Sequence, residues 1–336
     1  MPTSAASSTW PPISGWTSSS APDPSLKEPV NTTDPVAYAG LWPALLTPLD
    51  AALAIDIPRF AAHACQLLAQ GCTGVTPFGT TGEGPSFSVA ERQAGLEGLV
   101  AGGVPAGRIL ASTSCAALPD TVALTRHAVA LGARACLVLP PFFLKGVPEA
   151  GIIDYYAQLV EAVDDSRLRL VPYHIPQVSG VALTHGVIEA LLHRFPGLVI
   201  GLKDSGCQRE PSLAFAAAFM SRLQVWVGNE PDLQTLAAQG ARGAVSGVGN
   251  IAPRLVQRLI QGAASPSAER DAQDVQQLLA ILGGYGLTAA FKSTMALLSG
   301  HDGWRRVRAP LVALDDAAHA RLSAQWQAFG LERLRA

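Results

Sequence analysis

The sequence has few charged residues, few lysines and no long hydrophobic run. Charged residues make up 15% of its 336 positions, four of its 24 basic residues are lysines, and the net charge is −2. This balance predicts no basic surface of the kind that binds nucleic acid or an anionic membrane. No apolar stretch reaches the roughly 18 to 20 residues that span a bilayer, and the start of the chain lacks a secretion signal. We therefore expect a cytoplasmic protein.

Cysteine is also scarce. The five cysteines are odd in number, scattered, and never in Cys-x-x-Cys spacing, which argues against both a disulfide framework and a zinc site. We expect them to be small core residues.

Residues 1–36 differ in composition from the rest. They are rich in Ser, Thr, Pro and Ala and lack a periodic apolar pattern. Such a segment buries too little surface to offset the entropy lost on ordering, so we predict a flexible extension. Trp10 and Trp16 leave open an alternative in which the extension docks on the domain or on a neighbouring subunit.

From residue 37 onward, short apolar runs alternate with longer helical patterns. The eight runs are 41–46, 74–77, 108–112, 135–139, 168–173, 198–203, 224–227 and 243–245. Near-continuous apolar strands that alternate with helices indicate a parallel sheet covered by helices, and eight such units favour a closed (β/α)8 TIM barrel. We assign residues 37–263 to this barrel and residues 264–336, which carry only helical patterns, to a small C-terminal helical region.

Lys203 ends one of the apolar runs. An ammonium at the end of a buried strand loses hydration, which favours the neutral amine, and a neutral amine is a nucleophile toward carbonyls. The alternative is that Lys203 simply caps the strand and reaches solvent.

Two other strand ends carry polar groups, and in this fold the chemistry lies at the carboxyl ends of the strands. Gly-Thr-Thr-Gly-Glu at 79–83 could present hydroxyls and backbone N–H groups to a carboxylate. Tyr173 ends the strand before that of Lys203, close enough for its hydroxyl to relay a proton. Singly, an ordinary turn and a packing tyrosine are the alternatives; their joint occurrence with Lys203 favours a catalytic site.

These segments, together with Gly-Ala-Arg-Gly-Ala-Val-Ser at 240–246, resemble the signatures of the dihydrodipicolinate synthase/N-acetylneuraminate lyase family, the class I pyruvate-dependent aldolases. The resemblance implies a Schiff base between Lys203 and pyruvate or another 2-keto acid. It implies that Thr80 and Thr81 hold the carboxylate and that Tyr173, aided by Thr81, moves protons. It implies that the protein uses neither a metal nor an organic cofactor. It also implies that the protein is a homo-oligomer, either a tetramer or a dimer.

The sequence departs from the synthase pattern at two places. Val178 stands where the synthases have an arginine that binds the carboxylate of the aldehyde. In the loop at 140–145, Phe142 and Phe143 stand where the synthases lend a tyrosine to the adjoining subunit. Neither ring can carry a proton, so the proton chain of a true synthase is interrupted.

The sialic acid lyase pattern is incomplete as well. Gly-Asn-Glu-Pro at 228–231 replaces the acidic run that grips a polyhydroxyl tail. Glu230 remains as one hydroxyl acceptor, with a solvated loop acid as the alternative. We expect Gly228, Val245 and Phe143 to line the substrate together with Glu230.

We therefore predict a Schiff-base-forming aldolase that cleaves or forms a carbon–carbon bond in a 2-keto acid. The substrate we favour is a 2-keto-3-deoxy sugar acid, with an aldehyde as the second partner. Three alternatives stay open. They are a dihydrodipicolinate synthase, a dehydratase or hydratase-aldolase on the same Schiff base, and a non-catalytic barrel that binds 2-keto acids.

Overall fold

The computed structural model describes residues 35–262, 264–330 and 333. Seven parallel strands form one sheet in the order β1-β7-β6-β5-β4-β3-β2. The strands are β1 Gly40–Pro43, β2 Leu110–Ser112, β3 Ala135–Val138, β4 Leu170–His174, β5 Gly201–Asp204, β6 Gln224–Val227 and β7 Gly243–Ser246.

The gap between β1 and β2 is closed by the run 74–77. Thr76 forms a parallel bridge with Ala44 and Val75 forms one with Ile109. Pro77 has no N–H with which to extend this pairing, so the strand predicted here is reduced to two bridges at the expected place. The predicted (β/α)8 barrel is thereby confirmed.

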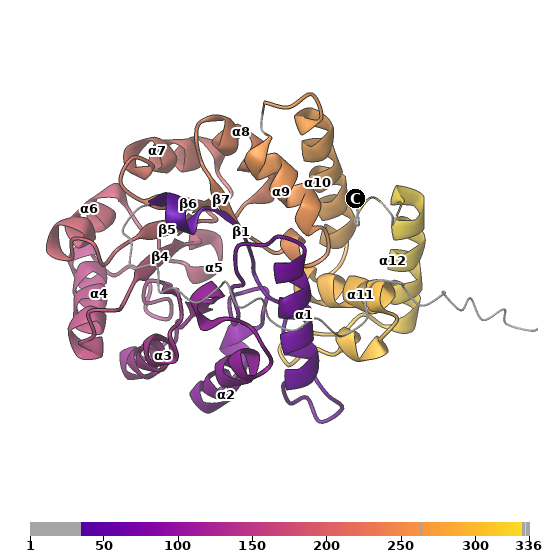
Figure 1. Cartoon of the computed structure of the whole chain (residues 1–336), viewed down its shortest axis with the longest axis horizontal. Coiled ribbons are helices and arrows are strands. Elements are labelled where there is room, and N and C mark those ends of the chain that lie inside the picture. Colours follow the sequence, from indigo (N-terminus) through magenta and orange to yellow (C-terminus); the bar gives the residue numbers. More distant parts are fainter. Residues whose placement is uncertain (1–34, 263, 331–332, 334–336) are drawn as a thin grey trace, which may run out of the picture.

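Helices follow the strands and surround the barrel (Figure 1). Their bounds are α1 Ile57–Ala69, α2 Val89–Ala101, α3 Leu118–Leu131, α4 Glu149–Val163, α5 Pro176–Ser179, α6 His185–Arg194, α7 Arg209–Phe219, α8 Leu233–Ala238, α9 Pro253–Gln261, α10 Ala268–Gly283, α11 Leu287–Ser299 and α12 Asp316–Phe329. The shorter 3-10 helices are η2 Pro35–Tyr38, η3 Gly84–Ser86, η4 Ala106–Arg108, η5 Glu230–Asp232, η6 Val248–Asn250 and η7 Asp302–Arg305.

Local side chains determine where several helices begin. The Asp56 side chain accepts a hydrogen bond from the backbone of α1, and the Thr184 side chain does the same for α6. Ser88 and Glu91 form a capping box at the start of α2, in which each side chain bonds the other residue's backbone N–H. These caps lie in the loops at the carboxyl ends of the strands and so help to shape that end of the barrel.

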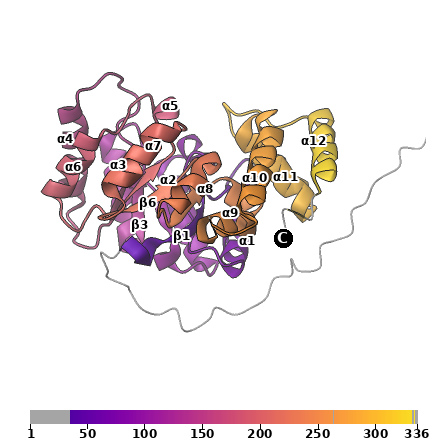
Figure 2. The ribbon, with the colours of Figure 1, turned by 90° about the horizontal axis from the view of Figure 1, so that it is seen from above.

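The C-terminal helices α10, α11 and α12 lie together on one side of the barrel (Figures 1 and 2). Helix α10 packs on α9 and α8, and α11 packs on α10, α12 and η7. The extension predicted at residues 1–36, with Trp10 and Trp16, lies outside the described residues except for Pro35 and Val36, which begin η2.

The amino-terminal end of the barrel is filled by aromatic rings. Trp42 and Tyr38 meet Trp226 edge-on, at ring distances of 6.4 Å and 6.3 Å. Glycines leave the room for these indoles, because a Cβ at Gly201 would lie 2.3 Å from the Trp226 ring and one at Gly74 would lie 2.1 Å from the Trp42 ring. This end of the barrel is therefore closed and packed, and it leaves the opposite end for chemistry.

Gly201→Ala should lower the free energy of unfolding by about 1–3 kcal/mol, because the added methyl meets the Trp226 ring and a backbone oxygen in a packed core. Gly151→Ala is the matched control. Its Cβ would meet nothing within 4 Å in helix α4, so this change should be neutral or stabilise by up to about 1 kcal/mol. Urea unfolding of both variants measures the difference, and equal stabilities would show that the indole packing tolerates the methyl.

Candidate active site

Lys203 and Tyr173 lie side by side inside the barrel. They are register partners on β5 and β4, and the Lys203 Nζ lies 4.0 Å from the centre of the Tyr173 ring. Lys203 exposes 5% of its surface and Tyr173 exposes 3%. The two residues predicted from separate motifs are thus brought into contact, and the alternative in which Lys203 reaches bulk solvent does not hold.

The next pair in the same two strands points the other way. His174 and Asp204 are also register partners, and successive residues of a strand face opposite sides. The His174 Nδ1 accepts a hydrogen bond of 3.0 Å from the backbone N–H of Leu183, and its ring packs against Phe215. Burial lowers the pKa of His174, although Asp204 opposes this. This histidine joins the barrel to its helices.

Ser205 is a site residue to which the sequence motifs assign no role. It follows β5, exposes 4% of its surface, and its Oγ has no hydrogen-bond partner among the residues that the structure describes. A buried hydroxyl without a partner is uncommon in folded proteins, so the Ser205 Oγ is a candidate for binding a polar ligand. The Lys-Asp-Ser sequence could have flagged it, because a side chain two residues after Lys203 on an extended chain faces the same side.

Gly228 keeps open the space between Ser205 and Lys203. A Cβ at this position would lie 1.9 Å from the Ser205 Oγ and 3.0 Å from the Lys203 Cε. No larger residue fits at the end of β6 without displacing one of the two side chains. Gly228 therefore lies beside Lys203 and Ser205, and the absence of a side chain there leaves room for both.

The threonine loop, residues 79–83, lies beside the residue that follows β7. A Cβ at Gly247, the residue after β7, would lie 3.4 Å from the Thr81 Oγ1. Thr80 is exposed and Thr81 is half-buried. Neither threonine hydroxyl has a hydrogen bond within the described part of the chain, so both can bind a ligand. The backbone of the loop is held at Gly82, since the Thr47 Oγ1 donates a hydrogen bond to the Gly82 carbonyl at 2.7 Å.

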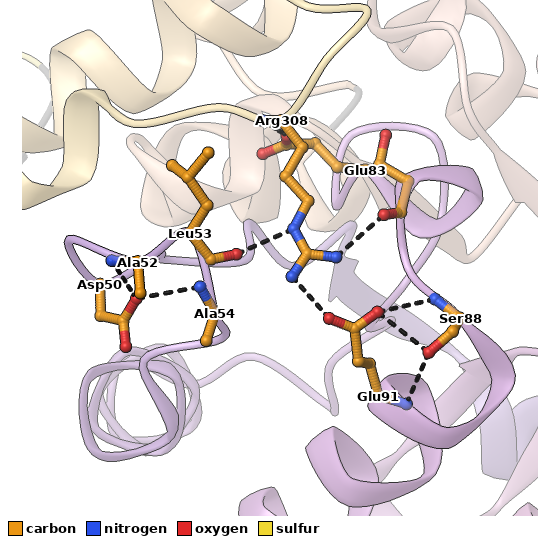
Figure 3. Close-up of polar contacts among 9 residues, drawn as sticks. Asp50, Ala52, Leu53, Ala54, Glu83, Ser88, Glu91 and Arg308 are labelled. Carbon is orange, nitrogen blue, oxygen red and sulfur yellow. Dashed lines mark hydrogen bonds and ion pairs between the residues drawn. The ribbon is translucent and has the colours of Figure 1, made fainter.

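Glu83 is the last residue of the threonine loop, and both oxygens of its carboxylate accept hydrogen bonds from the protein. One of its carboxylate oxygens accepts from Lys292 Nζ at 2.5 Å. The other accepts from the backbone N–H of Arg308 at 2.9 Å, and Figure 3 shows Glu83 beside Arg308. The side chains of Glu83 and Lys292 are both 0% exposed. Burial lowers the pKa of Lys292, while the adjacent Glu83 raises it. Glu83 therefore holds the loop and does not act as an acid or base.

Glu230 and Val245 lie near the carboxyl end of β7. One carboxylate oxygen of Glu230 accepts from the Ser246 Oγ at 2.7 Å and from the Val248 backbone N–H at 3.3 Å. Glu230 is thus a half-buried, ordered carboxylate, and its second oxygen accepts no hydrogen bond from the residues that the structure describes. Val245 exposes 1% of its surface and packs in the same apolar cluster as Tyr173.

Phe143 lies on the surface of the single chain. It exposes 76% of its surface, and Leu144 and Val178 expose 66% and 58%. The loop that carries Phe143 is tied to α5, because the Lys145 Nζ donates to the carbonyl oxygens of Phe142 and Ser179. At position 178, where the synthases have an arginine, this protein has the uncharged Val178.

Neither a metal cluster nor a membrane span emerges from the described residues. They contain no group of three or more His, Cys, Asp or Glu side chains arranged to hold a metal ion. Within the same residues, no helix combines the length and the apolar character that crossing a bilayer requires.

Comparisons of this chain with a family model, with known protein sequences and with solved structures identify relatives of the same family. The model of the dihydrodipicolinate synthetase family matches residues 37–329. An uncharacterised DapA-like lyase of Chloroflexus aurantiacus is 38% identical over 218 residues, which are 64% of this chain and 72% of that protein. The crystal structure of dihydrodipicolinate synthase from Agrobacterium tumefaciens has a TM-score of 0.81 at 30% identity, covering 87% of this chain and 99% of that one. A variant of Sulfolobus solfataricus 2-keto-3-deoxygluconate aldolase shares the fold, with a TM-score of 0.78 at 19% identity over 88% of this chain and 98% of its own.

Proposed function

The chain belongs to the dihydrodipicolinate synthetase family of lyases, the class I aldolases, and on that premise we propose that Lys203 forms a Schiff base with pyruvate or a related 2-keto acid. The observation that carries the proposal is the contact of two buried side chains, Lys203 Nζ and the Tyr173 ring, at 4.0 Å. A nucleophile and an acid-base group within reach of one carbon are what covalent aldol chemistry needs.

The reaction follows from these positions. The amine of Lys203 adds to the keto carbon; one amine proton and one further proton convert the keto oxygen to water, which leaves, and an iminium ion forms. For cleavage, a proton leaves the substrate hydroxyl, the adjacent carbon–carbon bond breaks, the aldehyde departs, and the electron pair forms an enamine. Protonation of the enamine carbon and hydrolysis then release pyruvate and restore Lys203. Tyr173 relays these protons, and Thr80 and Thr81 hold the carboxylate by hydrogen bonds.

We propose a 2-keto-3-deoxy sugar acid or a related hydroxylated 2-keto acid as substrate. The unpartnered Ser205 hydroxyl and the second oxygen of Glu230 offer bonds to substrate hydroxyls. A carboxylate on the aldehyde would find no positive partner at Val178, which is 58% exposed, so the pairing that an arginine at this position would offer is lost. The fold is also that of a 2-keto-3-deoxygluconate aldolase.

Two other activities on the same Schiff base remain candidates. The likeness to dihydrodipicolinate synthase at 30% identity favours the synthase, whereas Val178 and Phe143 oppose it. A dehydratase would expel a hydroxyl from the enamine in place of an aldehyde, and it would release no free pyruvate.

We also propose that the active protein is a cytoplasmic homo-oligomer, a tetramer or a dimer. Phe143, Leu144 and Val178 are large apolar side chains left exposed near the site, and such exposed groups are typical of contact surfaces.

Borohydride added with pyruvate should reduce the imine and add a stable adduct to the peptide that carries Lys203. Lys203→Ala should abolish the adduct. Peptide mapping by mass spectrometry is the measurement, and an adduct recovered on Lys145 or Lys292 would refute the assignment of the nucleophile.

Tyr173→Phe should slow turnover by roughly 10²-fold or more, the usual scale for a lost acid-base group. Thr81→Val should act mainly on binding and raise the KM for the 2-keto acid. Steady-state kinetics separate the two effects. A tyrosine variant with wild-type kcat would show that another group moves the proton.

Pyruvate release from a panel of 2-keto-3-deoxy acids should be faster than condensation of pyruvate with aspartate semialdehyde, whose carboxylate finds no positive partner at Val178. The Lys203→Ala variant is the blank for both assays. Faster condensation with the semialdehyde would make the protein a synthase, and consumption of the 2-keto acid without free pyruvate would make it a dehydratase.

A further inference from the structure

The threonine loop is fixed from the far end of the chain. Glu83, its last residue, bonds Lys292 of helix α11, which lies 209 positions away in the sequence. Glu83 also has a left-handed backbone, with φ of 58°. The flanking glycines are tightly packed, because a Cβ at Gly82 would lie 2.5 Å from the Leu45 carbonyl and one at Gly84 would lie 1.9 Å from the Phe78 carbonyl. The loop therefore has little freedom to move beneath its threonines.

A buried ion pair fixes the relative positions of its two side chains more readily than it raises the free energy of unfolding. Both Glu83 and Lys292 are removed from water, and the cost of removing two charges from water often equals or exceeds the gain from pairing them. Replacing a buried ion pair by an apolar pair of the same shape is often neutral for stability. What the charged pair adds is a defined direction, since the carboxylate must meet Lys292 Nζ and the Arg308 backbone N–H together.

Arg308 adds a second set of bonds around the same loop (Figure 3). Its guanidinium donates to the carbonyl oxygens of Leu53 and Ser86 at 2.8 Å and 3.0 Å, and to the Glu91 carboxylate at 2.5 Å. It also lies over the Phe87 ring, 4.4 Å from the ring centre. The segments before and after the threonine loop are thus joined to one residue of the C-terminal region.

Helix α11 also reaches the threonine side of the loop. A Cβ at Gly247 would lie 3.1 Å from the Phe291 ring and 3.4 Å from the Thr81 Oγ1. Phe291 immediately precedes Lys292, so one turn of α11 packs near Thr81 and bonds Glu83.

We propose that Lys292 is a positioning residue of the 2-keto acid site: through Glu83 it sets the place of the Thr80 and Thr81 hydroxyls relative to Lys203, so that the C-terminal helices determine how tightly the substrate carboxylate is held. The inference rests on the proposed function, because it takes the threonine hydroxyls to be the carboxylate site. Lys292 touches no reacting atom, and its effect passes through the loop.

The test compares the double variant Glu83→Gln/Lys292→Met with the wild-type protein. The two changes remove both charges and keep the shapes of both side chains. The pyruvate concentration that gives half-maximal borohydride-trapped adduct on Lys203 should rise by roughly tenfold or more, the scale on which small misplacements of binding groups act. The adduct yield at saturating pyruvate should stay at the wild-type level, because Lys203 and Tyr173 are unchanged.

Asp271→Asn is the matched control. It removes another buried carboxylate of the C-terminal helices, one that pairs with Arg258 of α9 and has no bond to the threonine loop. It should lower the melting temperature without moving the pyruvate dependence. An equal rise in the half-maximal pyruvate concentration of the control would show that general destabilisation causes the effect, and it would overturn the inference.

If the double variant does not fold, Glu83→Gln alone serves, because the buried Lys292 amine can shed its proton when its partner is neutral. The same rise in half-maximal pyruvate is expected. An unchanged pyruvate dependence in a folded variant overturns the positioning role and leaves the proposed function intact. A wild-type protein that forms no adduct overturns both.

Discussion

The site depends on the parallel register between β4 and β5. This register places Tyr173 opposite Lys203 on the inside of the barrel and His174 opposite Asp204 on the outside. Because side chains alternate along a strand, a shift of β4 by one residue would place His174 opposite Lys203 and turn Tyr173 to the outside of the barrel. Barrel closure through the bridges of Val75 and Thr76 then brings the threonine loop to the same mouth.

The loops that carry the chemistry are held by long-range polar bonds in an otherwise apolar interior. Asn250 is one such tie. Its side-chain oxygen accepts from the Leu46 N–H, and its amide donates to the carbonyls of Ala44 and Gly247, which joins the ends of β1 and β7. The Glu83–Lys292 pair does the same between the threonine loop and α11. A preorganised site needs such support, because small displacements of binding groups are costly.

The sequence predicted the parts of this architecture that local patterns encode. Apolar runs alternating with helical patterns gave the barrel, and the strand-end motifs identified Lys203 and Tyr173 as neighbours. The run 74–77 was expected as a full strand, but only two residues pair. The partner of Glu83 could not be foreseen, because a lone lysine 209 positions away leaves no periodic or spacing signal. The sequence places Ser205 on the same side as Lys203, but only the structure shows that its hydroxyl has no partner among the described residues.

The crystal structure of the borohydride-trapped pyruvate adduct tests the central claim most directly. The account predicts a covalent bond from Lys203 Nζ to the former keto carbon, the adduct carboxylate bonded to the hydroxyls of Thr80 and Thr81, and the Tyr173 hydroxyl within hydrogen-bond distance of the reacting centre. An adduct on Lys203 whose carboxylate lies away from the threonine loop, or a Tyr173 hydroxyl that points elsewhere, would contradict it.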